Sequence, residues 1–199
     1  MSNYRIAAVV LAAGQSSRMG FNKLLAELNG KPLIVRVVEQ VAASGVVRII
    51  VVTGHQADEI KAALKDAEVQ FVHNYDYAQG LSTSLRAGLL VAKAFDGAIV
   101  CLGDMPLIEA GLIKRMIAAF EAKQGRSIVA PVVNGELGNP VLWGRNRLAE
   151  LMSLRGDKGA RGILEAERAE VVEIPVVGES VLLDADTPDA LAKIRQTLS

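Results

Sequence analysis

Short apolar segments alternate with amphipathic ones along most of this chain, and this alternation restricts its possible folds more than any other feature. The apolar segments are rich in valine and isoleucine and are bounded by glycine, as strands buried on both faces are. They predict strands at 6–11, 47–54, 69–74, 97–106 and 127–133. The amphipathic segments predict helices at 31–45, 57–67, 81–95, 108–123 and 187–198. The alternation predicts an α/β chain with a Rossmann-like three-layer fold around a mostly parallel sheet.

The rhythm changes in the last third of the chain. Residues 134–144 read as a hairpin turn with its return strand, and two short helices are expected at 145–154 and 159–166 around a polar turn. Late strands are expected at 169–176 and 180–186. No internal repeat or linker interrupts the pattern, so we expect a single domain, 1–199, with an irregular insertion at about 134–170.

Composition narrows the possible partners. Lysine plus arginine equals aspartate plus glutamate, at 22 each, so the overall charge favours neither nucleic acid nor an anionic membrane. With a single cysteine, Cys101, the chain can form neither an internal disulfide nor a paired-cysteine metal site. Because Cys101 lies in a predicted buried strand, we expect it to pack as a small hydrophobic residue and to have no chemical role. The apolar stretch near the amino terminus is too short to span a bilayer, so we expect a cytoplasmic protein.

A glycine-containing loop with two cations follows the first predicted strand. In open parallel sheets, ligands bind beyond the carboxyl ends of the strands, which is where this loop begins. Gly14 and Gly20 permit positive φ angles and let backbone amides approach an anion. Arg18 can fork onto phosphate oxygens and Lys23 can add a point charge, so the loop favours a triphosphate ligand.

Two known phosphate-binding patterns do not fit this loop. The P-loop requires lysine directly after its second glycine, whereas Phe21 and Asn22 follow Gly20 here. The dinucleotide fingerprint requires a glycine two residues after the first, and Ser16 stands there. A plain strand–helix turn with solvated charges stays open as an alternative.

Carboxylates follow two other predicted strands. Asp104 comes at the end of the fourth strand and should face the same crevice as the loop. A triphosphate needs more positive charge than two side chains supply, and Mg²⁺ with hard oxygen ligands would provide it. Asp184 and Asp186 alternate, so on an extended segment they point the same way. The alternatives are purely structural roles: Asp104 in a turn before Pro106, and Asp186 as the cap of the last helix.

Three hydroxyls, on Ser82, Thr83 and Ser84, lie at the start of a predicted helix. Free amides at a helix start and nearby hydroxyls can bind a ligand, but simple capping explains at least one of them. His55 and His73 have no third partner in view that would complete a metal site.

These elements occur in the order and spacing of a known family. The chain carries "LAAGxSxRMGxxK" at 11–23, "GKP" at 30–32, "VTGH" at 52–55, "QGLSTSLRAGL" at 79–89, "CLGDMPLI" at 101–108, "GNPVLW" at 138–143, "GDKGARGIL" at 156–164 and "DADTPDAL" at 184–191. Together they resemble the MobA-like nucleotidyltransferase family over nearly the whole chain. Within it, "LAAG" in place of "LAGG", with the "STSLRAGL" and "GDKGAR" elements, looks closest to the molybdenum cofactor cytidylyltransferases.

The resemblance implies roles for individual residues. It implies nucleotide contacts from Leu11, Ala12, Ala13, Gly14, Arg18, Lys23, Asn74, Gly80, Ser82, Ser84 and Gly103. It implies that Arg18, Lys23 and Asp104 are catalytic, and it favours Asp186 over Asp184 as the second Mg²⁺ ligand beside Asp104. The implied acceptor contacts are Asn139, Asp157, Lys158 and Arg161. Relatives often have histidine at 139, and a solvated turn is the alternative at 157–161. Trp143 is expected in the core rather than as a stacking platform.

The implied reaction is transfer of CMP from CTP to the terminal phosphate of molybdopterin, with release of pyrophosphate. The partners would be CTP and molybdopterin, with a molybdoenzyme or its chaperone as recipient, and neither nucleic acid nor membrane. Guanylyl transfer to the same pterin and nucleotidyl transfer to another phosphorylated acceptor stay open. A non-catalytic nucleotide- or pterin-binding delivery module is the alternative of a different class, although such a binder could discard the cations and carboxylates that this chain keeps.

Overall fold

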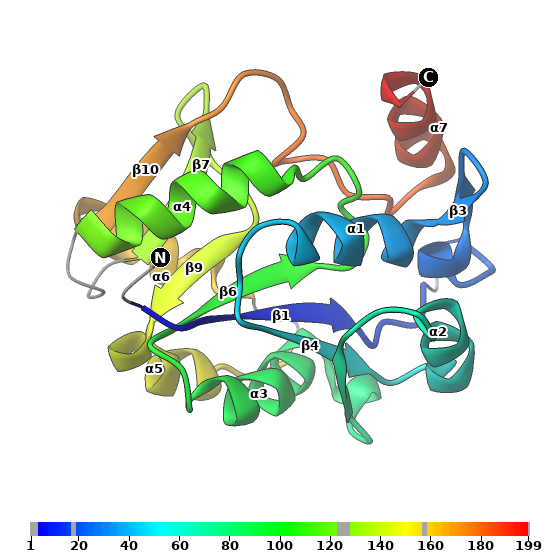
Figure 1. The fold of residues 1–199 in the computed structure, drawn as a ribbon, viewed down its shortest axis with the longest axis horizontal. Helices are drawn as coiled ribbons and strands as arrows, with labels where there is room; N and C mark the ends of the chain where they lie inside the picture. Colours follow the sequence, from blue (N-terminus) through cyan, green and yellow to red (C-terminus); the bar gives the residue numbers. More distant parts are fainter. Residues whose placement is uncertain (1–3, 17–18, 123–127, 157–158, 199) are drawn as a thin grey trace.

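The computed structural model describes residues 4–16, 19–122, 128–156 and 159–198, and it confirms the α/β class (Figure 1). The strands are β1 (Ile6–Ala12), β2 (Glu27–Leu28), β3 (Lys31–Pro32), β4 (Arg48–Thr53), β5 (Gln70–His73), β6 (Gly97–Leu102), β7 (Ile128–Val133), β8 (Glu136–Leu137), β9 (Val141–Gly144) and β10 (Val171–Pro175). The helices are α1 (Leu33–Ala42), α2 (Ala57–Ala63), α3 (Leu81–Ala92), α4 (Ala110–Ala122), α5 (Leu148–Met152), α6 (Arg161–Ala166) and α7 (Pro188–Thr197). Short 3₁₀ turns lie at Lys23–Leu25, Tyr77–Gln79, Arg145–Arg147 and Arg168–Glu170.

One sheet organises the molecule, with strand order β10-β7-β9-β6-β1-β4-β5 and β8 paired to β7. β1 pairs in parallel with both β4 and β6, β4 with β5, and β10 with β7. β9 runs antiparallel to both of its neighbours. β8 is also antiparallel to its neighbour β7, so the sheet is mostly parallel and both exceptions lie in the irregular part of the chain.

The two faces of the sheet are buried by different helices, which makes three layers (Figure 1). Alternate residues of β1 belong to opposite cores, with Ala8 and Val10 facing one and Ala7 and Val9 the other. The first core is completed by α1, α2, α4 and α7, and the second by α3, α5 and α6. Burial on both faces explains why the β1 segment is continuously apolar, since every residue of it is buried.

The expected strand at 180–186 is wrong. This segment forms no ladder and is held by single backbone hydrogen bonds instead: the Asn139 N–H donates to Val181 O, and the Ala185 N–H donates to Asp104 O. A strand needs a neighbour along its length, and this segment instead runs across the carboxyl edge of the sheet.

Helix ends also differ from expectation. α2 ends at Ala63, before the predicted end at 67, and α1 begins after Pro32, which is its N-cap. Between the first strand and α1, a small β2–β3 hairpin turns at Asn29 and Gly30, both with positive φ. No helix in the described part of the chain is long and apolar enough to cross a membrane.

Candidate active site

A crevice of about 510 Å³ opens at the carboxyl ends of β1 and β6. It is lined by Leu11, Ala13, Gly14, Gln15, Ser16, Lys23, Leu24, Tyr77, Ala78, Gly80, Leu81, Ser84, Leu102, Asp104, Asp184 and Asp186. β4 and β6 lie on opposite sides of β1, so the order in which strands are added to the sheet reverses at β1. Such a switch in strand order is where open α/β sheets bind ligands.

The glycine loop forms one wall of the crevice. Gly14, Gln15 and Ser16 lie just after the end of β1 and line the crevice. Ser16 has a positive φ of 52°, and its Oγ accepts a hydrogen bond of 3.2 Å from the backbone N–H of Lys23. The loop is therefore tied to the residue that carries its second cation. Arg18, the other predicted cation, lies outside the described residues.

Lys23 joins the two predicted metal ligands. Its Nζ donates to Asp104 Oδ2 and to Asp186 Oδ1, so one ammonium bridges two carboxylates from distant parts of the sequence. The side chains of Lys23 and Asp104 are only 12% and 16% exposed, whereas that of Asp186 is 41% exposed. The oxygens of both carboxylates thus converge on a single cation at the floor of the crevice.

The electrostatics keep this centre charged. Burial alone would lower the pKa of Lys23, but Asp104 and Asp186 outweigh it and raise the pKa above its ordinary value. Burial, together with the charges of Asp186 and Asp104, raises the pKa of Asp184 above its ordinary value. Lys23 therefore stays protonated at neutral pH and holds the carboxylate pair together.

Asp186 is not the cap of the last helix. The N-cap of α7 is Thr187, whose side chain accepts a hydrogen bond from the Ala190 N–H at 3.1 Å, and Pro188 begins the helix. The "DTP" sequence therefore supplies its cap with the threonine. This leaves the Asp186 carboxylate to face Lys23, and Asp184 lines the same crevice.

The start of α3 forms the opposite wall. Its N-cap is Gly80, with a φ of 108° and no side-chain cap, so simple capping does not account for the three hydroxyls. The Asn74 side-chain amide donates to Thr83 Oγ1 and Ser84 Oγ, both at 2.9 Å. Ser84 lines the crevice, while the hydroxyl of Ser82 is buried without a hydrogen-bond partner among the described residues.

Close backbone contacts fix these walls against the sheet. A Cβ on Gly103 would lie 2.7 Å from Leu11 O, so only glycine lets the Asp104 loop pack this closely against β1. A Cβ on Gly54 would lie 2.7 Å from the Tyr77 Cβ and 2.9 Å from the Ala13 Cβ. The glycines of "VTGH" and "LGDMP" therefore allow close packing of the segments that line the crevice.

The predicted nucleotide residues divide into two groups. Those that line the crevice are Leu11, Ala13, Gly14, Lys23, Gly80 and Ser84, and the predicted metal ligands Asp104 and Asp186 line it with them. Those that lie behind its walls are Ala12, Asn74, Ser82 and Gly103. The sequence reading missed Gln15, Ser16, Leu24, Tyr77, Ala78, Leu81 and Leu102. Most of these residues are immediate neighbours of predicted residues in the chain. Their position beside the motifs could therefore have indicated that they line the crevice.

A smaller pocket of about 160 Å³ shares Leu11, Leu81 and Leu102 with the crevice. We call it the tryptophan pocket; its other lining residues are Leu85, Val100, Leu137, Gly138, Asn139, Val141, Trp143, Leu151, Gly159, Ala160, Arg161 and Leu164. Two predicted acceptor residues, Asn139 and Arg161, thus lie together here. The other two, Asp157 and Lys158, fall outside the described residues.

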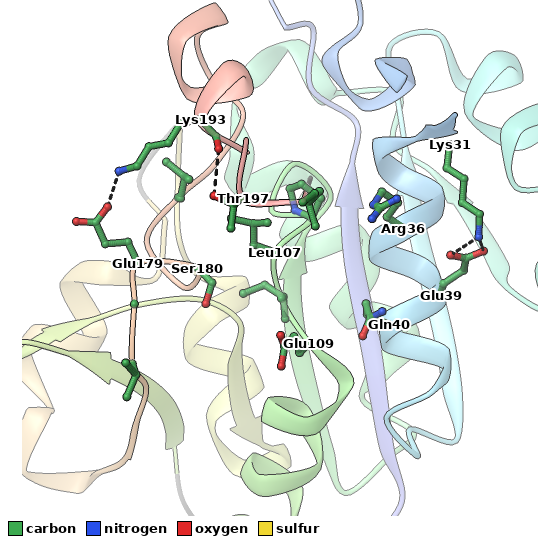
Figure 2. Close-up of a pocket in the computed structure, with 16 residues that line it drawn as sticks. Lys31, Arg36, Glu39, Gln40, Leu107, Glu109, Glu179, Ser180, Lys193 and Thr197 are labelled. Carbon is green, nitrogen blue, oxygen red and sulfur yellow. Dashed lines mark hydrogen bonds and ion pairs between the residues drawn. The ribbon is translucent and has the colours of Figure 1, made fainter. Parts of the chain in front are cut away.

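A third pocket, of about 620 Å³, lies apart from all the predicted site residues (Figure 2). It is formed by α1, the 106–109 loop, the 177–183 segment and α7. Two ion pairs occupy its edges, Lys31 with Glu39 at 2.7 Å and Lys193 with Glu179 at 2.6 Å (Figure 2). Its size alone does not make it the active site, because the glycine loop and the carboxylates are elsewhere.

Other titratable side chains do not form a metal centre. Among the described residues, no group of three or more His, Cys, Asp and Glu is arranged to hold a metal ion. His73 lies edge-on to Tyr75, and burial raises the pKa of Cys101 to about 12. Any metal bound beside Asp104 and Asp186 would need further ligands from substrate phosphates and water, as Mg²⁺ commonly has.

Comparison with known proteins identifies the family of this chain. The model of the family described as MobA-like NTP transferase domain matches residues 8–171. The bifunctional protein GlmU of Agrobacterium fabrum is 36% identical over 160 residues, which cover 77% of this chain and 34% of that protein. This chain therefore spans about a third of the length of the GlmU relatives that it matches.

Two further relatives match along almost the entire chain. The molybdenum cofactor cytidylyltransferase of Escherichia coli K12 is 28% identical over 185 residues, 92% of both chains. The structure of Rv0371C from Mycobacterium tuberculosis H37Rv in complex with manganese superposes with a TM-score of 0.83 and 27% identity, covering 97% of this chain and 99% of that one.

Proposed function

This chain belongs to the MobA-like NTP transferase domain family, and on that premise we propose that it transfers CMP from CTP to the terminal phosphate of molybdopterin, releasing pyrophosphate. The observation that carries the proposal is the convergence of Lys23, Asp104 and Asp186 beside the glycine loop. The full-length similarity to a molybdenum cofactor cytidylyltransferase supports this choice of donor and acceptor. The family itself makes the chain a nucleotidyltransferase.

The crevice provides what a nucleotide triphosphate requires. Gly14, Gln15 and Ser16 line one side of it, and Gly80, Leu81 and Ser84 at the start of α3 line the other. A glycine-containing loop can turn backbone amides toward an anion, and the dipole at the start of a helix favours negative charge. In this proposal Lys23, with Arg18 outside the described residues, binds the phosphate oxygens. Ser82 and Ser84 lie near the base and ribose.

The carboxylate pair fits a divalent cation. Asp104 and Asp186 already direct oxygens at one positive centre, the Lys23 ammonium, and hard oxygen donors are what Mg²⁺ prefers. Asp104 and Asp186 are therefore the residues that would hold Mg²⁺. When bound there, the ion would neutralise charge that develops on the phosphates. The manganese complex of a structural relative supports a divalent metal in this family.

The chemistry needs no covalent nucleophile from the protein. A phosphate oxygen of the acceptor attacks the α-phosphorus of CTP, the bond from that phosphorus to the β-bridging oxygen breaks, and pyrophosphate leaves. The chain contributes positioning and preorganised charge, the two effects that dominate phosphoryl-type transfers. Lys23 stabilises the triphosphate, and Asn139, Arg161, Asp157 and Lys158 are the proposed acceptor contacts.

A nucleotide panel tests this proposal. Purified protein with molybdopterin and Mg²⁺ is assayed for pyrophosphate with CTP, GTP, UTP and ATP, and we expect CTP to give the highest kcat/KM. A preference for GTP would reassign the reaction to guanylyl transfer. Release of pyrophosphate with a sugar phosphate but not with molybdopterin would reassign the acceptor, and binding without turnover of any nucleotide would favour a delivery module.

A further inference from the structure

Hydrogen bonds from α3 hold the segment that follows α5. The two helices pack beside each other on one face of the sheet (Figure 1). The Arg86 guanidinium of α3 donates from Nε to Met152 O at 3.2 Å and from Nη2 to Leu154 O at 3.1 Å. The backbone N–H of Ser82 donates to Gly156 O at 3.1 Å. The first two turns of α3 therefore hold residues 152–156 at three points.

The same two turns of α3 form a wall of the crevice. Ser82 and Arg86 lie on one face of the helix, because residues four apart in a helix are neighbours on its surface. Ser84, in the first turn, lines the crevice, and the Asn74 amide donates to its hydroxyl. Backbone hydrogen bonds from each residue to the fourth one before it make adjacent turns move together. A displacement of the crevice wall is therefore passed to residues 152–156.

Arg86 is suited to fix the path of a backbone segment. It is half-buried, and within the described part of the chain its guanidinium donates to two carbonyls and pairs with no carboxylate. A guanidinium presents its donors in a rigid planar fork, whereas a lysine ammonium is a point charge on a flexible stem. One arginine can therefore hold two carbonyl oxygens in a set relation to the helix that carries it.

Residues 152–156 lead directly to the proposed acceptor side. Gly159, Ala160 and Arg161 line the tryptophan pocket, which shares Leu81 at the start of α3 with the crevice. Three residues of chain span at most about 11 Å, so the position of Gly156 limits where Gly159 can lie. The hold of α3 on residues 152–156 therefore also limits the distance between the acceptor side and the nucleotide side.

We propose that Arg86 is a positioning residue for nucleotidyl transfer, which keeps the acceptor side in register with the crevice wall formed by α3. Arg86 does not line the crevice, so it acts through the backbone that it holds. The inference rests on the proposed function only in taking residues 159–161 as the acceptor side. A misplacement of reacting groups by about 1 Å can cost on the order of 10² in rate, so this hold should affect turnover.

Two arginine variants separate positioning from stability. Arg86→Met keeps an apolar stem of similar length and removes every donor. Arg145→Met is the matched control: Arg145 Nε donates to Phe95 O, just after the far end of α3, and its Nη2 pairs with Asp96 at 2.9 Å. Arg145 lines neither the crevice nor the tryptophan pocket. Each change therefore removes an arginine that binds backbone near one end of α3.

Initial rates are measured well below the Tm of each variant, with the nucleotide and acceptor that the panel identifies. Arg86→Met should raise KM for the acceptor and lower kcat, each by roughly tenfold or more, and leave KM for the nucleotide unchanged. Arg145→Met should leave all three unchanged even where its Tm falls. Equal increases in both KM values, or kinetics in Arg86→Met that match those of Arg145→Met, would overturn the proposal.

Hydrogen exchange of the wild type tests the same connection without a variant. The backbone N–H groups of Ser153 and Leu154 donate to Glu150 O and Leu151 O, so their exchange reports opening of the held segment. Nucleotide with Mg²⁺ should slow their exchange by roughly threefold or more. Unchanged or faster exchange there, with the first turn of α3 protected, would overturn the proposal. Inactivity with CTP or molybdopterin would contradict the proposed function and leave the exchange result with a bound nucleotide in place.

Discussion

At the scale of single residues, Lys23 contacts more of the predicted site than its position beside a glycine loop indicated. The sequence predicted that Lys23 binds a triphosphate and that Asp104 and Asp186 bind a metal ion. The structure brings all three into one cluster, in which the ammonium stands where the two carboxylates converge. The lysine and a divalent cation therefore compete for the same oxygens, and the nucleotide offers the lysine other partners.

This competition predicts the behaviour of Lys23→Ala. Removing the ammonium leaves two carboxylates without their cation, so Mn²⁺ should bind the nucleotide-free variant more tightly, by roughly tenfold or about 1.4 kcal/mol. Mn²⁺ binding is measured by electron paramagnetic resonance or titration calorimetry. The same variant should lose turnover by on the order of 10²–10³, the usual effect of deleting one preorganised charge-stabilising group.

Lys31→Ala is the matched control for this experiment. Lys31 is half exposed and pairs with Glu39, and neither lines the crevice, so its removal should leave both Mn²⁺ affinity and turnover unchanged. Unchanged or weaker Mn²⁺ binding in Lys23→Ala would mean that the lysine and the metal do not share a position.

At the scale of elements, α3 must approach the sheet closely for its first turn to reach the crevice. A Cβ on Gly88 would lie 2.4 Å from Val9 Cγ1 and 2.9 Å from Val52 Cγ2, so the helix lies directly on β1 and β4 at this point. Gly88→Ala should therefore destabilise the protein by about 1–3 kcal/mol through overpacking, although alanine favours helix. Chemical denaturation measures this.

Gly111→Ala serves as the comparison, since a Cβ in that part of α4 meets nothing within 4 Å. It should be neutral or stabilising by up to about 1 kcal/mol, because glycine loses more backbone entropy in a helix than alanine does. If Gly88→Ala were as stable as Gly111→Ala, the close packing of α3 on β1 would be refuted.

The elements that the sequence predicted well are those whose signal is local. β1, β4 and β6 are buried on both faces and therefore read as apolar runs, and α1 and α3 show helical spacing. The β2–β3 hairpin was missed although Asn29–Gly30, a strong two-residue turn signal, lies in its centre. The 180–186 segment was misassigned because alternation along a chain does not reveal whether a neighbouring strand exists.

Site residues follow the same division. Asp104 and the glycine loop could be placed from sequence, because each directly follows a buried strand of a parallel sheet. The bridging role of Lys23 could not, since it depends on how the 103–109 loop and the 181–186 segment meet. That meeting rests on the Ala185 N–H bonding to Asp104 O at 3.0 Å, a contact between distant parts of the chain.

At the scale of the whole molecule, we expect nucleotide and metal to stabilise the fold together. The crevice joins β1, β6, α3 and the segment before α7, so a ligand bound there holds most of the domain. A ligand at a hundred times its Kd adds about 2.7 kcal/mol, which corresponds to a rise in Tm of roughly 5–10 °C. Thermal denaturation should show this rise with CTP plus Mg²⁺.

The controls for this measurement separate the components. CTP with a chelator and Mg²⁺ alone should each give a much smaller rise, and Lys23→Ala should reduce the response to the pair. A full rise with GTP plus Mg²⁺ but none with CTP plus Mg²⁺ would contradict the assigned base. A full rise with CTP in the presence of the chelator would contradict metal-assisted binding.

The central claim is that Asp104 and Asp186 act as one unit in nucleotidyl transfer, and a double-mutant cycle on pyrophosphate release tests it most directly. Asp104→Asn and Asp186→Asn keep the side-chain shape and remove the charge, so each should raise the barrier by several kcal/mol. The double variant should be little slower than the slower single one, because both changes disable the same centre. Multiplicative losses would contradict the claim, as would near-normal turnover in Asp186→Asn, which would instead direct attention to Asp184.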